Sequence, residues 1–186
     1  FYVFLVTSDS IYSPIIQDFN DARDIQFQKV IWNSDGTKFM QINFRGYMAE
    51  YSFNRCSGVI SNLRTVYPET SNGNGRYFWE GAYSANDTLF YVSTGSTSFS
   101  DSLYLIQYDL SAANVLLTSD TLETFMHPIG TGAVRLAPDA KIYFSRAYEC
   151  NAFPYCYPYP DSARNYVNEH LSVINNPNNA GAACDY

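Results

Sequence analysis

The residues best suited to recognition chemistry are aromatic side chains gathered in one segment, residues 147–169. Tyrosine offers a large contact area at a small entropic cost, and long loops often carry function. Three prolines stiffen the segment, so less entropy is lost on binding. Two interpretations follow: the rings pack under their own loop or on a neighbouring domain, or they bind a protein or a glycan. The expected binding residues are Tyr148, Phe153, Tyr155, Tyr157 and Tyr159.

Motifs for catalysis or metal binding are missing from the sequence. Neither histidine, His127 or His170, has a second ligand at metal-binding spacing. There is no nucleophile elbow, zinc-protease motif or phosphate loop, and the aspartate series of a calcium loop is absent. The sequence therefore predicts no catalytic residue, no metal and no cofactor, and we expect the chain not to be an enzyme.

An enzyme remains the alternative function, because acids from distant segments can converge in a fold. Such a protein would be an extracellular hydrolase or lyase with its site in a central channel. Several acids with Arg or His pointing into that channel would favour it, since perturbed charged groups cluster at active sites. An apolar channel with an ordered aromatic loop would favour binding.

The four cysteines indicate an oxidising compartment. Cys150 and Cys156 lie close together in the aromatic segment, and we expect a local disulfide worth about 2 kcal/mol. Cys56 and Cys184 follow comparable strands of different repeats, which places them farther apart than the ~5–6 Å between Cα atoms that a disulfide needs. They are expected to stay free or to pair outside this chain.

A turn followed by a β-rich run recurs three times and predicts the architecture. The copies are NSDGTKFMQI, SANDTLFYVS and APDAKIYFS, in which Asp35, Asn86 and Asp139 hold the same slot at intervals of 51 and 53 residues. Strand-only repeats of this period are typical of β-propeller blades. The three slot residues are interpreted as turn formers that cap the following backbone amides.

The repeats predict an all-β fold, a partial β-propeller domain over residues 1–186 with three blades plus the outer strand of another. The 17 Tyr and 13 Phe support strands. Because propellers have about four to eight blades, we expect the remaining blades from the same longer polypeptide, as part of a larger ring. The expected units are residues 1–20 (blade remnant), 25–67, 77–125 and 130–186, the last with the insertion 147–169.

Each complete unit is expected to contain four strands and almost no helix. In the second unit the expected strands are residues 78–83, 89–93, 103–110 and 115–118.

The charge of the chain limits the kinds of partner that it can bind. A formal net charge of −7 argues against nucleic acid and anionic membranes as partners. No apolar run approaches the ~20 residues of a spanning helix, so we expect no membrane insertion.

The chain resembles the WD40-like propeller domain of large secreted surface proteins of the Bacteroidota, which is often followed by PKD-type or sorting domains. The resemblance rests on IWNSDGTKFMQI, on AYSANDTLFYVST and on the ending PDAKIYFS…LSVINNPNNAGAACDY. Ala140 stands where the family usually has Gly, and the insertion splits the last unit. The resemblance implies a secreted or cell-surface location and a scaffold without a common activity. The expected function is therefore a non-enzymatic surface module for binding, adhesion or display.

Asp followed by Ser or Thr and a small or aliphatic residue occurs five times. One interpretation is the passage from an Asp-led turn into a strand. The other follows from the resemblance, because the tripeptide looks like the O-glycosylation acceptor of exported Bacteroidota proteins. The acceptors would be Ser10, Thr88, Ser102, Thr121 and Ser162.

Overall fold

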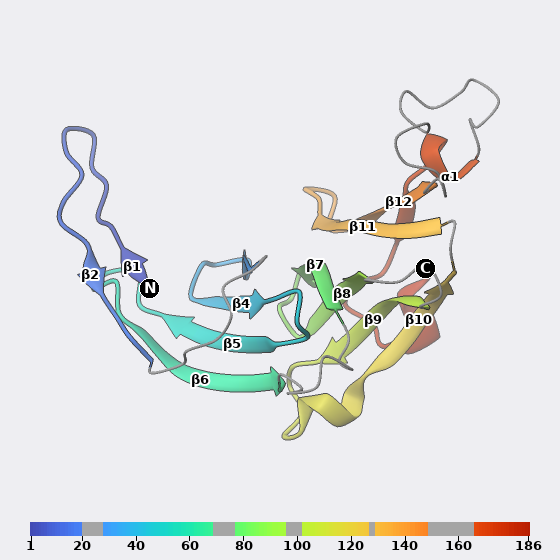
Figure 1. The fold of residues 1–186 in the computed structure, drawn as a ribbon, viewed down its shortest axis with the longest axis horizontal. Coiled ribbons are helices and arrows are strands. Elements are labelled where there is room, and N and C mark those ends of the chain that lie inside the picture. The colour runs from blue at the N-terminus through green and yellow to red at the C-terminus, as the bar shows by residue number, and fades with distance from the viewer. Residues whose placement is uncertain (20–27, 69–76, 96–101, 127–128, 149–165) are drawn as a thin grey trace.

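The protein is an all-β molecule of stacked antiparallel sheets, seen in a computed structural model (Figure 1). The structure describes residues 1–19, 28–68, 77–95, 102–126, 129–148 and 166–186. Three sheets follow one another along the chain, preceded by a small hairpin. This arrangement is a β-propeller-type fold, as the repeat predicted.

The first large sheet runs in the order β3-β4-β5-β6, the second in the order β10-β9-β8-β7 and the third in the order β11-β12-β13. The strands of the first sheet are β3 (Lys29–Trp32), β4 (Lys38–Ile42), β5 (Met48–Phe53) and β6 (Ile60–Tyr67). Those of the second are β7 (Tyr77–Tyr83), β8 (Leu89–Gly95), β9 (Leu103–Asp109) and β10 (Asp120–Phe125). Those of the third are β11 (Ile129–Leu136), β12 (Ile142–Tyr148) and β13 (Ser172–Ile174).

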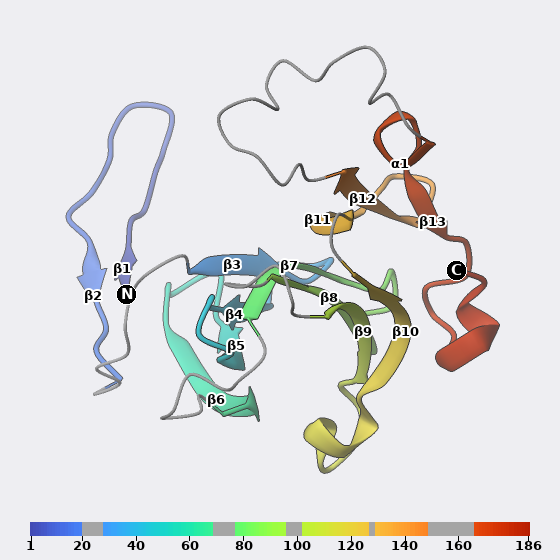
Figure 2. The same ribbon diagram turned by 45° about the vertical axis from the view of Figure 1, so that its right-hand side comes forward.

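The first strands of the three sheets, β3, β7 and β11, come together, and the sheets fan outward from them (Figure 2). Each of these inner strands is the edge of its own sheet. The side of the strand that is not paired therefore faces the common axis. Backbone and side chains of three different repeats meet there.

Apolar side chains fill the space between successive sheets. One cluster joins the first two sheets, with Met40 and Met48 packed near Phe90 and Ile106. A second joins the second and third sheets around Tyr91, Phe144 and Ile174. Every sheet thus buries apolar groups by contact with a neighbour, which is the constraint that repeat architectures share.

The hairpin of residues 1–19 packs on the outer face of the first sheet. It contains β1 (Tyr2–Val3) and β2 (Ile15–Ile16), so the predicted outer strand is part of a two-stranded unit. The Gln17 side chain fixes it by donating to the Gly58 carbonyl and by accepting from the Ile60 amide. Phe1 packs against the Phe39 and Tyr51 rings with centroids 5.4–5.6 Å apart.

Two strand predictions are wrong, for separate reasons. Residues 115–118 form a 3-10 helix, η1 (Val115–Thr118), in which only Val115 is buried. The fourth strand of the second sheet is β10. It was not predicted from the sequence, because most of its side chains are not buried and show little apolar alternation. In the third sheet the described residues supply three strands, because residues 175–184 leave the sheet after β13. Short helices also form at α1 (Tyr166–Glu169) and η3 (Gly181–Cys184).

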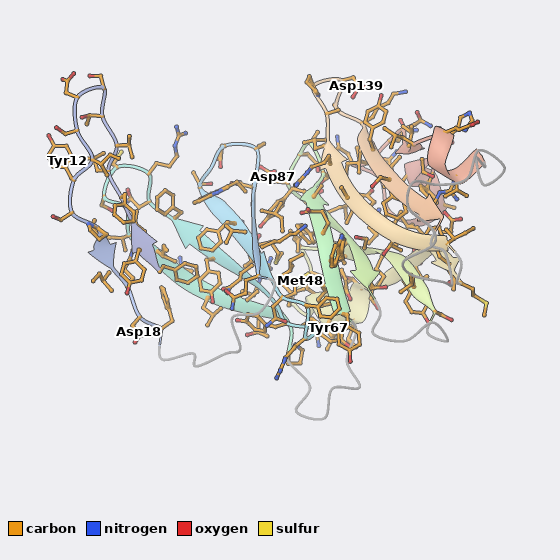
Figure 3. The ribbon with its side chains drawn as sticks, turned by 45° about the horizontal axis from the view of Figure 1, so that its top comes forward. Tyr12, Asp18, Met48, Tyr67, Asp87 and Asp139 are labelled. Atoms are coloured by element: carbon orange, nitrogen blue, oxygen red, sulfur yellow. The ribbon has the colours of Figure 1, made fainter. Side chains whose placement is uncertain are left out.

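The repeated turns are capped as predicted. The Asp35 carboxylate accepts from the Thr37 amide, Asn86 Oδ1 accepts from the Thr88 amide, and Asp139 Oδ1 accepts from the Lys141 amide. Hydrogen bonds from the Thr37 hydroxyl to Asp35 and from the Tyr143 hydroxyl to Asp139, followed by these amide bonds, hold the pKa of both carboxyl groups below the usual value. The turn of the second sheet also contacts that of the first, since Asp87 accepts from the amide and hydroxyl of Ser34 (Figure 3).

The shape shared by these three turns requires a residue with a left-handed backbone conformation directly after the capping residue. Gly36, Asp87 and Ala140 hold this position, with φ of 69°, 59° and 62°. Glycine adopts this conformation freely, whereas alanine does so against the repulsion of its Cβ. Ala140 therefore carries local strain that Gly36 lacks.

The C-terminal segment 175–184, called the clasp, reaches back from the third sheet to the second. Gln107 Nε2 donates to the Asn179 carbonyl at 3.0 Å, and Gln107 Oε1 accepts from the Gly181 amide at 2.8 Å. Tyr91 donates its hydroxyl hydrogen to the Pro177 carbonyl at 2.9 Å. The clasp ends in Cys184, which is fully buried in the cluster between the two sheets.

We predict that Ala140→Gly stabilises the protein and Gly36→Ala destabilises it. Relief of left-handed strain, about 1–2 kcal/mol, exceeds the unfolded-state entropy that glycine adds, about 0.4–1 kcal/mol. The net gain for Ala140→Gly is up to ~1.6 kcal/mol, with a loss of similar size for Gly36→Ala. Chemical denaturation measures both. A loss of stability in Ala140→Gly would show that the Cβ makes a contact that outweighs the strain.

We predict that Gln107→Leu opens the clasp. The change keeps a similar volume and removes two hydrogen bonds to the clasp and one to the Tyr91 hydroxyl, at a cost of roughly 2–3 kcal/mol. Thiol labelling followed by peptide mass mapping reports it, because Cys56 is exposed and Cys184 is buried. Native protein should label at Cys56, and Gln107→Leu should label at Cys184 as well. Gln41→Leu, in the first sheet, is the control; if it exposes Cys184 equally, the clasp is not the cause.

Candidate functional site

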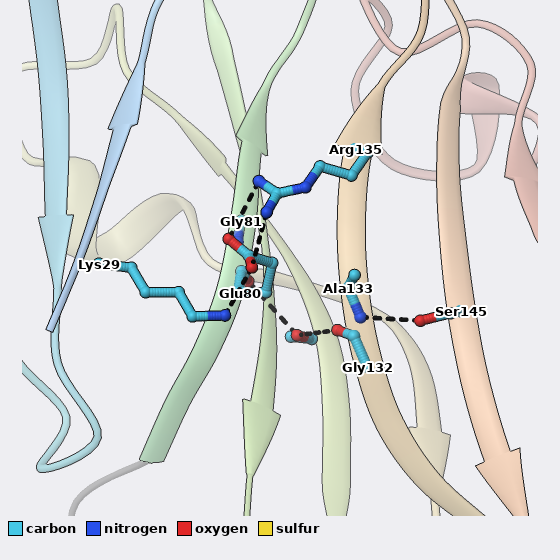
Figure 4. Close-up of polar contacts among 8 residues, drawn as sticks. Lys29, Glu80, Gly81, Gly132, Ala133, Arg135 and Ser145 are labelled. Atoms are coloured by element: carbon cyan, nitrogen blue, oxygen red, sulfur yellow. Dashed lines mark hydrogen bonds and ion pairs between the residues drawn. The ribbon is translucent and has the colours of Figure 1, made fainter. Parts of the chain in front are cut away.

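The candidate site lies on the axis, where three charged side chains from the three inner strands converge (Figure 4). Lys29 comes from β3, Glu80 from β7 and Arg135 from β11. Lys29 Nζ lies 2.6 Å from Glu80 Oε2. Arg135 donates from Nη1 to Glu80 Oε1 at 3.3 Å and from Nη2 to Glu80 Oε2 at 3.1 Å. We call these residues the axial triad.

Irregularities in two inner strands place the triad. The pairing of β7 with β8 shifts between Phe78 and Glu80, so that Trp79 is the extra residue immediately before the carboxylate. The pairing of β11 with β12 shifts between Thr131 and Val134, just before Arg135. Bulges of this kind redirect the side chains that follow them. Glu80 therefore follows its bulge directly, and Arg135 follows its bulge after Val134.

Close packing supports the bulges from behind. Ser93 donates its hydroxyl to the Gly132 carbonyl at 2.8 Å, joining β8 to β11. The Ala133 amide donates to Ser145 Oγ at 2.8 Å. A Cβ on Gly132 would stand 2.9 Å from the Ser145 carbonyl oxygen, and one on Gly81 would stand 2.8 Å from the Tyr91 carbonyl oxygen. Glycine is required at both positions because the backbones approach so closely.

The three members of the triad differ in exposure. The Glu80 side chain is 3% exposed, whereas Lys29 is 41% and Arg135 is 64% exposed. A buried carboxylate needs cationic partners, and here it has two. Because Glu80 carries one negative charge against two positive charges, the triad has a net charge of +1. Lys29 is further held over the Trp79 ring at 5.4 Å.

A cavity of about 410 Å³ opens beside the triad. Its walls are residues 30–34, 81–83 and 134–136, which belong to β3 and its turn, to β7 and to β11. Arg135 is the one charged residue among them, and most of the other side chains are apolar. Tyr83 donates its hydroxyl to Glu50 at 3.3 Å, and burial followed by the Glu50 charge raises its pKa, so the phenol stays protonated.

The axial triad was not found from the sequence, although a signal for it exists. Lys29 and Glu80 both precede the capping residue of their turns by six positions, and Arg135 precedes Asp139 by four. The shared offset of Lys29 and Glu80 points to one axis, whereas Arg135 stands at a different offset and has no such signal. The catalytic search failed because it looked for motifs that are local in sequence.

Of the recognition residues expected in the insertion, Tyr148 alone belongs to the described part of the chain. Tyr148 is the last residue of β12, and its backbone pairs with Ile129. Phe153, Tyr155, Tyr157 and Tyr159 lie outside the described residues, as do Cys150, Cys156 and Ser162. Their binding role and the disulfide stay predictions. Cys56 and Cys184 are not bonded to one another in the structure, and a partner outside this chain stays a prediction.

The other expected residues are scattered over the surface. Ser10, Thr88 and Thr121 are exposed and Ser102 is half-buried, in separate parts of the fold. Their glycosylation stays a prediction. Among the described residues no group of His, Cys, Asp or Glu is arranged to hold a metal. Within the same residues, no helix is long and apolar enough to span a membrane.

Comparison with solved structures supports the propeller-type fold. A periplasmic gluconolactonase from Pseudomonas aeruginosa matches with a TM-score of 0.52 and 12% identity, over 80% of this chain and 43% of its own. A luciferin-regenerating enzyme gives 0.48 and 15%, over 78% and 44% of the two chains. The extracellular domain of a protein described as a one-component system from B. thetaiotaomicron gives 0.48 and 11%, over 78% and 17%. No protein-family model and no curated protein matches the sequence.

This chain spans less than half the length of each of these structures. The comparison corrects the prediction that the chain is not an enzyme. A gluconolactonase is built on the same kind of fold, so a propeller without local catalytic motifs gives no ground for excluding catalysis. The physical reason is that residues far apart in sequence converge on the axis, as Lys29, Glu80 and Arg135 do.

We predict that Glu80→Gln lowers the free energy of unfolding by about 1–2 kcal/mol. The change removes the charge that neutralises two cations, but both cations can turn toward water, so the loss is below the ~3–5 kcal/mol of a fully buried pair. Denaturant titration at low and high salt measures it, with the exposed Glu169→Gln as control. Equal stability of Glu80→Gln and the wild type would mean that the ion pairs of the triad do not contribute to the free energy of unfolding.

Proposed function

We propose that this chain carries the axial site of a hydrolase or lyase. The observation that supports the proposal is Arg135, an exposed guanidinium held in place by a buried carboxylate at the wall of a cavity. Cavities with few convergent polar groups are the usual form of ligand sites. The gluconolactonase with this type of fold is a hydrolase of a sugar lactone, which agrees with the proposal without carrying it.

Both reaction classes build negative charge on a substrate oxygen. Hydrolysis of an ester or lactone passes through a tetrahedral oxyanion, and elimination beside a carboxylate passes through an enolate-like state. A cation fixed in advance stabilises either one without reorganising during the reaction. Arg135 has this role, because Glu80 occupies only two of the five N–H donors of the guanidinium.

Glu80 and Lys29 act as positioning residues. The Glu80 carboxylate is bonded on both oxygens by cations, which leaves it poorly suited to accept a proton from substrate. Its bidentate contact fixes the plane of the Arg135 fork. Lys29 supplies the second charge, so that the site remains positive after Glu80 is neutralised.

The setting of the site follows from the sequence. We propose that residues 1–186 are one partial propeller domain, with the axial site between its inner strands. The resemblance to WD40-like surface proteins of the Bacteroidota supports a secreted or cell-surface enzyme. Binding of protein or glycan by the aromatic insertion is a second surface of the same protein, separate from the axial site.

Turnover assays on the full-length chain test the proposed reaction. Hydrolysis of D-glucono-δ-lactone is followed by acid release, and elimination in polygalacturonate is followed by ultraviolet absorbance of the new double bond. We expect turnover of at least one substrate and a fall in kcat/KM of roughly 100-fold in Arg135→Ala. Arg55→Ala, which removes an exposed arginine away from the cavity, should retain activity. No turnover by the wild type in either assay would overturn the proposal.

A further inference from the structure

The hairpin of residues 1–19 exposes more apolar surface than a soluble monomer usually does. Its turn projects beyond the first sheet (Figures 1 and 2), and eight large apolar residues between positions 2 and 16 are 46–71% exposed. At about 100 Å² apiece they expose roughly 800 Å², whereas the largest apolar patch on a typical monomer is ~300–600 Å². One partner in a stable protein interface buries about 800 Å². The hairpin is therefore large enough to form such an interface.

The first arm of this hairpin, residues 1–7, has a backbone edge that faces away from the second arm, residues 10–17. The odd-numbered residues of the first arm bond the second: the Phe1 amine donates to it at 2.7 Å, and the Leu5 carbonyl accepts from it at 3.0 Å. In an antiparallel pair, the residues between such positions turn their amides and carbonyls to the opposite side. Tyr2 and Phe4 therefore each present a donor and an acceptor along the outer edge of β1.

The second arm is protected against an added strand, whereas the first arm is not. Val3 pairs with Ile15 and Val6 bridges Ile11, so three residues of the second arm oppose two of the first between these pairs. The extra residue makes a bulge in the second arm, and Pro14 within it has no amide hydrogen to donate. Bulges and prolines shield edge strands from pairing. A new strand can therefore pair with β1 but not with β2.

Apolar side chains flank the open edge of β1. Val3 packs against the apolar cluster of the first sheet. Successive residues of a strand point to opposite faces, so Tyr2 and Phe4 point away from that sheet. They are 69% and 52% exposed, and Ile16, which pairs with Tyr2, is 66% exposed. The outward face of the hairpin thus offers apolar contacts beside the unpaired backbone edge.

The distribution of charge favours this segment for contact between two copies of the chain. The formal net charge of −7 makes two copies repel each other at long range. Residues 1–19 contain two charged side chains, Asp9 and Asp18, and neither belongs to β1 or β2. Two β1 strands can therefore pair with each other without placing like charges opposite one another.

We infer that two copies of this chain associate by antiparallel pairing of their β1 edges. A two-stranded sheet is marginally stable in water, whereas the first and second sheets have four strands each. Pairing β1 with β1 of a second copy makes a four-stranded sheet in the order β2-β1-β1-β2. A two-fold axis relates the two copies, so the association ends at a dimer. The inference is independent of the proposed reaction.

Sedimentation equilibrium of the full chain over a range of concentrations tests the inference. We expect a dimer with a dissociation constant of roughly 1–100 µM, since interfaces of this size reach micromolar affinity or tighter. Tyr2→Pro should weaken association at least ~10-fold, because it removes one edge donor from each copy. Ile16→Pro is the matched control, since it makes the same change in the paired residue on the protected arm, and should leave the dimer intact.

Two further measurements separate edge pairing from damage to the hairpin. Hydrogen exchange of the Phe4 amide, followed by NMR in the wild type, requires no substitution. This amide should exchange slowly above the dissociation constant and rapidly below it. Leu117→Thr removes a side chain that is 79% exposed in η1, so it controls for the loss of apolar surface elsewhere and should still form the dimer. A melting curve checks the fold of each variant.

Three outcomes would overturn the inference. The first is a monomer at every concentration. The second is equal weakening by Tyr2→Pro and Ile16→Pro, which would mean that apolar contact without pairing at β1 joins the copies. The third is binding of the monomeric chain to phosphatidylcholine vesicles, which would assign the exposed hairpin to a lipid surface.

Discussion

The structure depends on the need of each sheet to cover two faces. A four-stranded sheet with apolar residues on both sides is unstable alone, because both faces would expose apolar side chains to water. Met40 and Met48 are covered by the second sheet, and Phe144 and Ile174 cover the far face of that sheet. Stacking sheets in this way brings their first strands to a common axis. The site is a consequence of this packing, since no single repeat contains it.

On the axis, the unpaired backbone edges of the inner strands lie beside the charged side chains of the axial triad. Inner strands are sheet edges, so charged side chains on them meet side chains from other repeats instead of their own sheet. Glu80 is tolerated in a nearly dry position because two cations reach it from either side. The same arrangement fixes Arg135 more firmly than an exposed surface arginine would be fixed. Arg135 is therefore held in place by its ion pair with Glu80 and is still exposed to solvent.

The sequence predicted the architecture because turns and strands are local. Asp35, Asn86 and Asp139 cap amides only two residues away, so their spacing was readable directly. The strand β10 was missed because an exposed outer strand has little apolar alternation, and η1 was misassigned because Val115 alone anchors it. The axial triad was missed because its contacts span 51 and 55 residues. The bulges before Glu80 and Arg135 depend on pairing partners that no local pattern specifies.

The clasp has a consequence for the order in which the chain acquires its structure during synthesis. Contacts between sheets otherwise join neighbours in sequence, so each sheet can dock as it leaves the ribosome. Gln107 and Tyr91 differ, because their partners lie 72 to 88 residues later. Until those residues emerge, the polar groups of Gln107 and Tyr91 have no partners in the clasp, although Val134, Ile142 and Phe144 already cover the apolar face of the second sheet. The polar contacts between the second and third sheets are therefore completed after their apolar contacts, when the clasp arrives.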